Sequence, residues 1–178
     1  AGRERGKRAG RGMADRAIAT GGARTAAGAV DRARMLGLAG FLLALAAIAT
    51  AWSFELVGGY VPCALCLEQR IPYYVGLPTI AVGLLVLGRA RTAGRLLLAA
   101  GGVALLWSAG LGAYHAGAEW GFWTGPADCG GADAVVRDAG DLLAAMQATR
   151  LVSCSEAAVR FLGLSFAGWN VVAAGGAA

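Results

Sequence analysis

Four cysteines are the residues of this chain with the most distinctive chemistry. Cys63 and Cys66 form a Cys-x-x-Cys motif directly after Pro62, and Cys129 and Cys154 lie farther along the chain. Proline suits the first turn of a helix, so the motif is expected at a helix N-terminus, where free N–H groups and the helix dipole stabilise a thiolate. Residues three apart share a helix face, which brings the two sulfurs within reach of a disulfide bond.

Two structural alternatives compete with a redox role for these cysteines. Cys-x-x-Cys is half of many zinc sites, but the second pair has the wrong spacing for a zinc ribbon and His115 is the only histidine, so no metal is expected. Alternatively, both pairs form disulfides that only stiffen the loops of a membrane scaffold. Against the scaffold, a crosslink over so short a loop as Cys63–Cys66 restricts little of the unfolded chain, and such tight pairs more often exchange electrons.

Long charge-free segments indicate which parts of the chain cross a membrane, and so where the cysteines lie relative to it. The chain is 57% hydrophobic and 15% charged, which is too apolar for an ordinary soluble domain and for a disordered protein. Four stretches contain no Asp, Glu, Lys or Arg: 35–54, 71–88, 96–118 and 161–178. Each approaches the roughly 20 helical residues that cross about 30 Å of hydrocarbon. The sequence therefore predicts an all-α, polytopic membrane protein, with the third span at about 96–116.

The fourth stretch is the weakest candidate for a span. It contains several glycines and the polar residues Ser165 and Asn170, and it reaches Ala178 before any flanking charged residue. We expect a short or truncated fourth span here. We also expect the natural gene product to extend past Ala178 by about one helix of apolar residues.

Lys and Arg predict the orientation of the spans. Nine of the 16 basic residues precede Met35 and three lie in the short connection 89–95, so both segments should be cytoplasmic. Loops 55–70 and 117–160 then face the opposite side, and all four cysteines fall in these loops, where an oxidising compartment favours disulfides. Residues 1–34 are expected to form a basic, disordered cytoplasmic tail. They lack the interleaved aromatic residues of a nucleic-acid-binding arm, so no nucleic-acid partner is expected.

Three segments of the chain resemble the disulfide bond formation protein B (DsbB) family of bacterial inner-membrane thiol oxidases. They are residues 62–74 (PCALCLEQRIPYY), 114–129 (YHAGAEWGFWTGPADC) and 160–170 (RFLGLSFAGWN). The resemblance runs from about residue 36 to residue 170. It implies a four-helix membrane bundle in 35–178, inserted in the inner membrane with the two loops in the periplasm.

The resemblance also implies a function and its cofactor. A Cys129–Cys154 disulfide would accept electrons from a soluble periplasmic dithiol oxidase of the DsbA type and pass them to Cys63–Cys66. A membrane quinone, ubiquinone or menaquinone, would remove them. By family analogy Cys129 forms the mixed disulfide with the partner. A quinone reductase like vitamin K epoxide reductase is an alternative of related design, but there the Cys-x-x-Cys lies late in the bundle, whereas here it follows the first span.

Three polar residues are candidates for binding the quinone. Arg70 lies four residues after Cys66, on the same helix face, where it can stabilise the Cys66 thiolate and a reduced quinone oxygen. Gln69 completes the Cys-x-x-Cys-x-x-Gln-Arg match to the family. His115, at the outer end of the third span, is expected to hydrogen-bond a quinone carbonyl or to carry a proton. The alternatives are an interfacial Arg70 that reaches lipid headgroups and a merely structural His115.

The second loop contains a further periodic segment. Apolar residues at helical spacing predict a short amphipathic helix in about 135–146, between the two loop cysteines. This helix either lies on the surface of membrane lipid and steers Cys129 toward its relay partner, or packs on the loop or the bundle.

Overall fold

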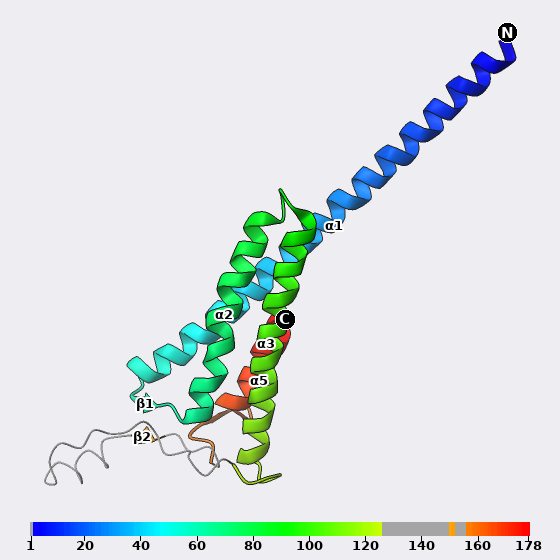
Figure 1. Ribbon diagram of the computed structural model, residues 1–178. Coiled ribbons are helices and arrows are strands. Elements are labelled where there is room, and N and C mark those ends of the chain that lie inside the picture. The colour runs from blue at the N-terminus through cyan, green and yellow to red at the C-terminus, as the bar shows by residue number, and fades with distance from the viewer. Residues whose placement is uncertain (1, 126–149, 152–155) are drawn as a thin grey trace, which may run out of the picture.

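The protein is helical, as the sequence predicts. The computed structural model describes residues 2–125, 150–151 and 156–178, with side chains described for 28–125 and 156–178. Its helices are α1 (Gly2–Leu56), α2 (Ala64–Val86), α3 (Arg91–Glu119) and α5 (Phe166–Ala177). Its strands, of two residues each, are β1 (Tyr60–Val61), β2 (Arg150–Leu151), β3 (Arg160–Phe161) and β4 (Leu164–Ser165). Figure 1 shows α2 and α3 side by side and α1 crossing them obliquely, with the shorter α5 packed against α3 and α1.

Two of the described helices are long and apolar enough to cross a bilayer. They are Gly28–Leu56 within α1, and α3. α2 begins with a polar portion that contains Glu68, Gln69 and Arg70, and its charge-free part starts only at Ile71. α5 has 12 residues, fewer than the roughly 20 that cross a bilayer. A bundle of four complete spans therefore stays a prediction.

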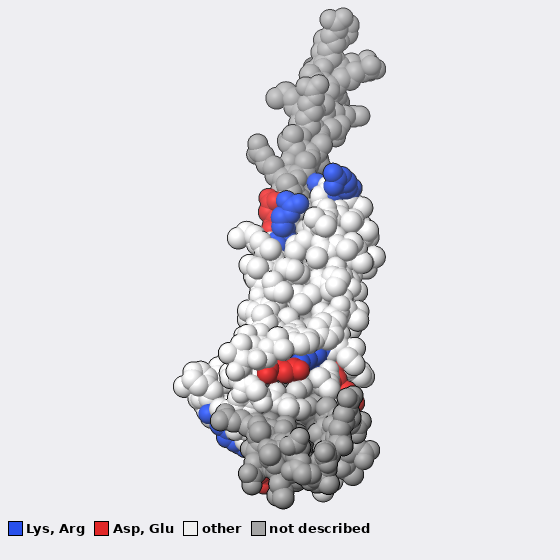
Figure 2. Space-filling view, turned by 90° about the vertical axis from the view of Figure 1, so that its left-hand side faces the viewer, with Lys and Arg blue, Asp and Glu red and all other residues white. Residues whose placement is uncertain are grey.

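An uncharged band crosses the middle of the bundle. On the face drawn in Figure 2, charged side chains gather toward the two ends of the described part of the molecule, and none lies between them. Large apolar side chains on the outside of the bundle, such as Leu42, Leu85 and Leu106, are exposed. Contiguous apolar surface of this kind is unfavourable in water and suits the hydrocarbon of a bilayer.

The N-terminal segment differs from its expected disorder. α1 begins at Gly2 and continues without a break into the first apolar stretch, so its first part projects beyond the bundle in Figure 1. Alanine and arginine are among the better helix formers, and a helix that is already nucleated by an adjoining span extends at little further cost. These two effects favour a helical backbone in residues 2–34, against the opposing effect of seven glycines in the same segment.

α2 and α3 approach closely because glycines face each other. A Cβ added at Gly101 of α3 would lie 2.3 Å from Ile80 Cγ1 and 3.1 Å from the Gly76 carbonyl oxygen, both of α2. Small residues allow helix backbones to approach in membranes, where packing replaces the hydrophobic effect as the driving force. The close contact fixes α2 relative to α3, and with it the groups that these helices bring together at the cysteine motif.

The cysteine motif lies at the end of the bundle where the two loops emerge. The end of α1, the start of α2, the end of α3 and the start of α5 meet there, opposite the α2–α3 turn (Figure 1). β1 pairs in parallel with β2, with Tyr60 opposite Arg150 and Val61 opposite Leu151. This pairing joins the segment before Cys63 to a segment of the second loop.

A tight hairpin sets the start of α5. Leu162 and Gly163, between the antiparallel strands β3 and β4, both have positive φ (51° and 85°), as in a type I′ turn. The Ser165 side chain then accepts a hydrogen bond from the Gly168 N–H and caps α5. The cap defines the start of α5, the helix that carries Asn170.

Gly101→Val is expected to reduce stability by about 1–3 kcal/mol, because overpacking of a close contact forces neighbouring groups apart. The measurement is thermal unfolding in detergent micelles, followed by circular dichroism.

Gly110→Val provides the matched control for this substitution. Gly110 lies on the same helix, so the change in helix propensity is the same, but a Cβ there meets nothing within 4 Å. An equal loss of stability in both variants would contradict the packing argument.

Candidate thiol redox site

Cys63 and Cys66 lie within reach of each other at the N-terminus of α2. Cys63 is the N-cap residue, with φ −72° and ψ 169°, and its Sγ accepts a hydrogen bond from the Cys66 backbone N–H at 3.3 Å. The two sulfurs are 3.0 Å apart and the structure holds both as free thiols. The motif is therefore where the sequence predicts it, at a helix start, with its sulfurs close enough to interconvert between dithiol and disulfide.

The surroundings of the two sulfurs shift their pKa values in opposite directions. A hydrogen bond from the Cys66 thiol lowers the pKa of Cys63 to about 4, with further help from His115 and the Cys66 backbone N–H, although burial acts in the opposite direction. The same contact with Cys63, reinforced by burial, raises the pKa of Cys66 above its usual range. In the reduced pair, Cys63 is thus the thiolate and Cys66 the thiol that donates to it.

His115 lies against Cys63 with a defined tautomer. Its Nε2 is 4.0 Å from Cys63 Sγ, and its Nδ1 is 2.9 Å from Gln69 Nε2. The same Gln69 nitrogen donates to the Leu65 carbonyl oxygen at 3.1 Å, and a carbonyl oxygen only accepts, so this atom must be the amide nitrogen. Nδ1 of His115 is therefore an acceptor, and the proton of the neutral ring is on Nε2, facing the sulfur.

A second amide holds Gln69 in this orientation. Asn170 Nδ2 donates to Gln69 Oε1 at 2.9 Å and to the Ser108 carbonyl oxygen at 3.1 Å, while Asn170 Oδ1 accepts from the Tyr73 hydroxyl at 2.8 Å. Ser108 Oγ donates to the Gln69 backbone oxygen at 2.8 Å. In this series each residue donates to the next, from Tyr73 to Asn170, Gln69 and His115, and the last N–H faces Cys63. The network joins α2, α3 and α5 and fixes the His115 ring.

The network also opposes a metal at this site. Cys63, Cys66 and His115 form a possible ligand set, with their ligand atoms within 4.8 Å of one another. A metal bound at Nε2 requires a lone pair there and a proton on Nδ1, and that proton would meet the Gln69 amide hydrogens. The donor set thus suits a thiolate facing an N–H better than a metal ion.

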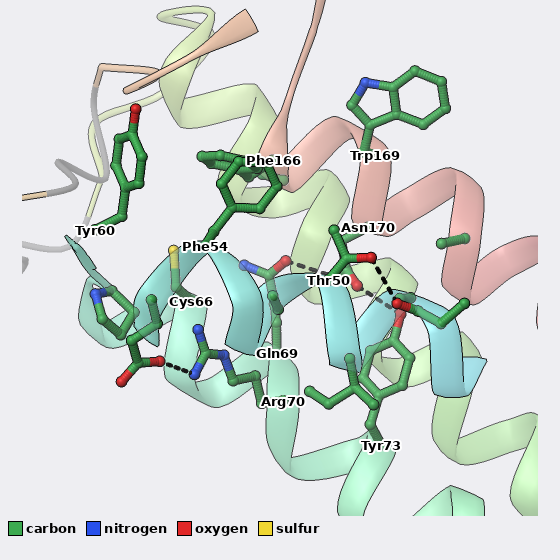
Figure 3. Close-up of a pocket in the computed structure, with 18 of the residues that line it drawn as sticks. Thr50, Phe54, Tyr60, Cys66, Gln69, Arg70, Tyr73, Phe166, Trp169 and Asn170 are labelled. Atoms are coloured by element: carbon green, nitrogen blue, oxygen red, sulfur yellow. Dashed lines mark hydrogen bonds and ion pairs between the residues drawn. The ribbon is translucent and has the colours of Figure 1, made fainter. Parts of the chain in front are cut away.

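A cavity of about 560 Å³ lies beside Cys66 (Figure 3). Its lining is largely apolar and includes Phe54, Tyr60 and Phe166, whose ring centroids are 4.7 to 6.1 Å apart. Cys66, Gln69, Arg70, Tyr73 and Asn170 supply most of its polar groups. The volume and the few polar groups are typical of small-molecule sites, which measure roughly 300–1,000 Å³.

Arg70 is held at this cavity by two residues of α1. Its Nη1 donates to Glu55 Oε2, and its guanidinium lies over the Trp52 ring, with Cζ 5.4 Å from the ring centroid. The side chain is largely buried, so it is not an interfacial arginine that reaches into solvent. A buried cation at the rim of an apolar cavity is suited to an anion or a partly negative oxygen.

Some of the predicted site residues lie at the cavity beside Cys66, and His115 lies beside Cys63. Cys66, Arg70 and Gln69 line the cavity, as expected of groups that face a cofactor. His115 is 1% exposed, lies on the Cys63 side, and is not among the residues that line the cavity, so the expected hydrogen bond to a quinone carbonyl is not supported by its position. Cys129, Cys154 and the segment 135–146 lie outside the described residues.

Sequence reasoning missed the residues that orient the site. Ser108 and Asn170 are isolated polar residues inside apolar stretches, and polar side chains in such helices are normally hydrogen-bonded to other helices. That rule would have selected both residues without a structure. Glu55 carried no comparable signal, because it lies in a predicted loop.

Comparisons with known proteins point to one family. Residues 33–178 match the family described as Disulfide bond formation protein DsbB. The chain is 25% identical over 144 residues to Uncharacterized protein RP370 of Rickettsia prowazekii (strain Madrid E), covering 80% of this chain and 81% of that protein. No solved structure matches the chain significantly.

In the reduced protein, the Cys63–Cys66 pair is expected to carry one thiolate that persists until the pH falls to about 4, because the pKa of Cys63 is lowered to about 4. His115→Phe removes the N–H that faces the sulfur, and should raise this pKa by about one pH unit, since a charge-assisted hydrogen bond contributes about 1.5 kcal/mol. The measurement is the ultraviolet absorbance of the thiolate during titration of the Cys129→Ser, Cys154→Ser chain.

The exposed Glu68 gives the control for this titration, because Glu68→Gln changes a charge in the same turn of α2 without touching His115. Identical titration of the His115→Phe and unsubstituted chains would show that the N–H does not stabilise the sulfur.

Proposed function

The chain belongs to the DsbB family of membrane disulfide bond formation proteins, and we propose that it passes electrons from a DsbA-type dithiol protein, through Cys129–Cys154 and Cys63–Cys66, to a membrane quinone. The family and the apolar helices make it a membrane protein with a thiol oxidoreductase activity. The observation that carries the proposal is the position of Cys66, which belongs to a close thiol pair and also lines an apolar cavity next to Arg70.

Electrons enter at Cys63. β1 ends two residues before Cys63, and β2, its parallel partner, ends three residues before Cys154. This pairing supports direct exchange between the loop cysteines and Cys63. When a loop thiolate attacks the Cys63 sulfur, the Cys63–Cys66 bond breaks and Cys66 leaves with the electron pair. Cys66 then carries the reducing equivalents on the cavity side of the motif.

The cavity fits a quinone ring. Its aromatic and aliphatic walls favour a flat, apolar ring, and residues of α1 and α5, including Leu43 and Ala173, continue the apolar lining toward the middle of the bundle, where a hydrocarbon tail would lie. When bound, a quinone supplies the oxidant, because it accepts two electrons and two protons. Arg70 would bind a quinone oxygen and stabilise its negative charge, while its contacts with Glu55 and Trp52 hold the guanidinium at the rim.

His115 stabilises the sulfur on the other side of the motif. With its proton on Nε2, it donates toward Cys63 and favours the thiolate that must attack Cys66 to close the disulfide again. The proposal also places the chain in the inner membrane, with both cysteine pairs on the periplasmic side. This orientation agrees with the concentration of Lys and Arg in 1–34 and 89–95, away from the cysteines.

Cys66→Ala should abolish quinone reduction, because the remaining sulfur of the motif cannot deliver two electrons by disulfide formation. The assay mixes the purified protein with a reduced DsbA-type protein and ubiquinone, and follows quinone reduction. Equal rates for Cys66→Ala and the unsubstituted chain would exclude the proposed route.

Cys129→Ala separates the two steps of the relay in the same assay. It should stop oxidation of the DsbA-type protein but leave quinone reduction by dithiothreitol, which reduces Cys63–Cys66 directly. Loss of both reactions would contradict the proposed division of roles.

Arg70→Met should raise the KM for quinone by about tenfold to a hundredfold, because a hydrogen bond from a charged group contributes about 1.5–3 kcal/mol. Arg70→Lys, which keeps the charge, should restore part of this loss. Arg91→Met removes an exposed arginine at the opposite end of the bundle and is the matched control. A KM for Arg70→Met equal to that of this control would show that Arg70 does not bind the quinone.

A further inference from the structure

A buried carboxyl group lies beside His115. Glu119 is the last residue of α3, one helical turn after His115, and its side chain is 3% exposed. Its Oε1 is 3.8 Å from His115 Nε2, and its Oε2 has no hydrogen-bond partner within the described part of the chain. A buried carboxylate with one oxygen unpaired is costly unless a nearby group supplies a hydrogen or a proton.

Two groups that can carry a negative charge face the same N–H. His115 Nε2 is 4.0 Å from Cys63 Sγ and 3.8 Å from Glu119 Oε1. A single N–H donates well to only one of them at a time. The titratable groups that face His115 in the described structure are Cys63 and its partner Cys66, from α2, and Glu119, from its own helix, whereas α5 contributes only the neutral Asn170 to the network.

The hydrogen bonds of His115 leave no ring nitrogen open to a further donor. Its Nδ1 accepts from the Gln69 amide, whose orientation is fixed by the Leu65 carbonyl oxygen, and its Nε2 faces Cys63 and Glu119. A doubly protonated ring would place two donors against each other at Nδ1. Among the described residues, the buried group within reach that is free to gain a proton is therefore Glu119.

We propose that Glu119 is the proton acceptor of the redox site, ionised while Cys63–Cys66 is a disulfide and protonated once the pair is reduced. This role rests on the proposed thiol oxidase function. In the disulfide state the Nε2–H donates to the Glu119 carboxylate. In the reduced state it donates to the Cys63 thiolate, and protonation of Glu119 avoids two negative charges around one buried N–H.

The reaction balances with a dithiol as the reductant. The dithiol loses two electrons and two protons and becomes a disulfide, and the Cys63–Cys66 bond breaks. Cys63 becomes a thiolate, Cys66 takes one proton as a thiol, and Glu119 takes the other. Reoxidation by a quinone reverses these changes and releases the proton of Glu119.

Infrared difference spectroscopy of the full-length chain tests this role. Reduction of the Cys129→Ser, Cys154→Ser protein with dithiothreitol should produce a new C=O stretching band of a protonated carboxylic acid, which shifts in D₂O. Glu119→Gln should abolish the band completely, and Glu68→Gln, an exposed carboxylate near the motif, should leave it unchanged. Absence of the band before any carboxyl substitution, or its persistence in Glu119→Gln, would overturn the proposal.

Two features of the design keep its outcomes separate. If Glu119→Gln fails to fold, Glu119→Asp retains a carboxyl group and should displace the frequency of the band, whereas an unchanged frequency would assign the band to another residue and overturn the proposal. The measurement uses a chemical reductant and no quinone. A chain that shows the band but does not reduce quinone would refute the oxidase function alone. A chain that reduces quinone but lacks the band would refute the role of Glu119 alone.

Discussion

The hydrogen bond from the Gln69 side-chain amide to His115 Nδ1 is the contact on which the redox site depends. It determines which ring nitrogen carries the proton, and so whether Cys63 faces a donor or a lone pair. It holds because both ends of the amide are constrained, the nitrogen by the Leu65 carbonyl and the oxygen by Asn170. Gln69 is almost completely buried, so loss of one partner would leave a polar group without water to replace it.

The fold supports this contact through close helix packing. Glycines at the α2–α3 contact bring the Cys-x-x-Cys helix against the helix that carries Ser108 and His115. The hairpin and the Ser165 cap set the start of α5, from which Asn170 reaches Gln69 and Tyr73. Buried polar groups from three helices are thereby paired within an otherwise apolar bundle. In a membrane such a network is retained where function requires it, because unpaired polar groups are expensive there.

The sequence was sufficient for the helical fold, the position of Cys63 and Cys66 at a helix start, and the shared face of Cys66 and Arg70, because these follow from local spacing and from charge-free stretches. It was insufficient for contacts between distant segments. The partners of Arg70 on α1 and of Gln69 on α5 depend on how the helices pack, which periodicity does not encode. The helical backbone of residues 2–34 was also missed, since a Gly-, Ala- and Arg-rich composition is compatible with either disorder or helix extension.

The parallel pairing of β1 with β2 has a consequence for the speed of the proposed electron transfer. Cys154 follows Leu151 by three residues, and a chain extends by at most about 3.6 Å per residue, so its Cα lies within about 11 Å of the Leu151 Cα. While the strands are paired, the length of this tether limits the separation of Cys154 and Cys63. Their encounter then proceeds at an effective concentration of the millimolar order that short tethers provide. In the proposed relay, this step is thereby independent of how dilute the protein is in its membrane.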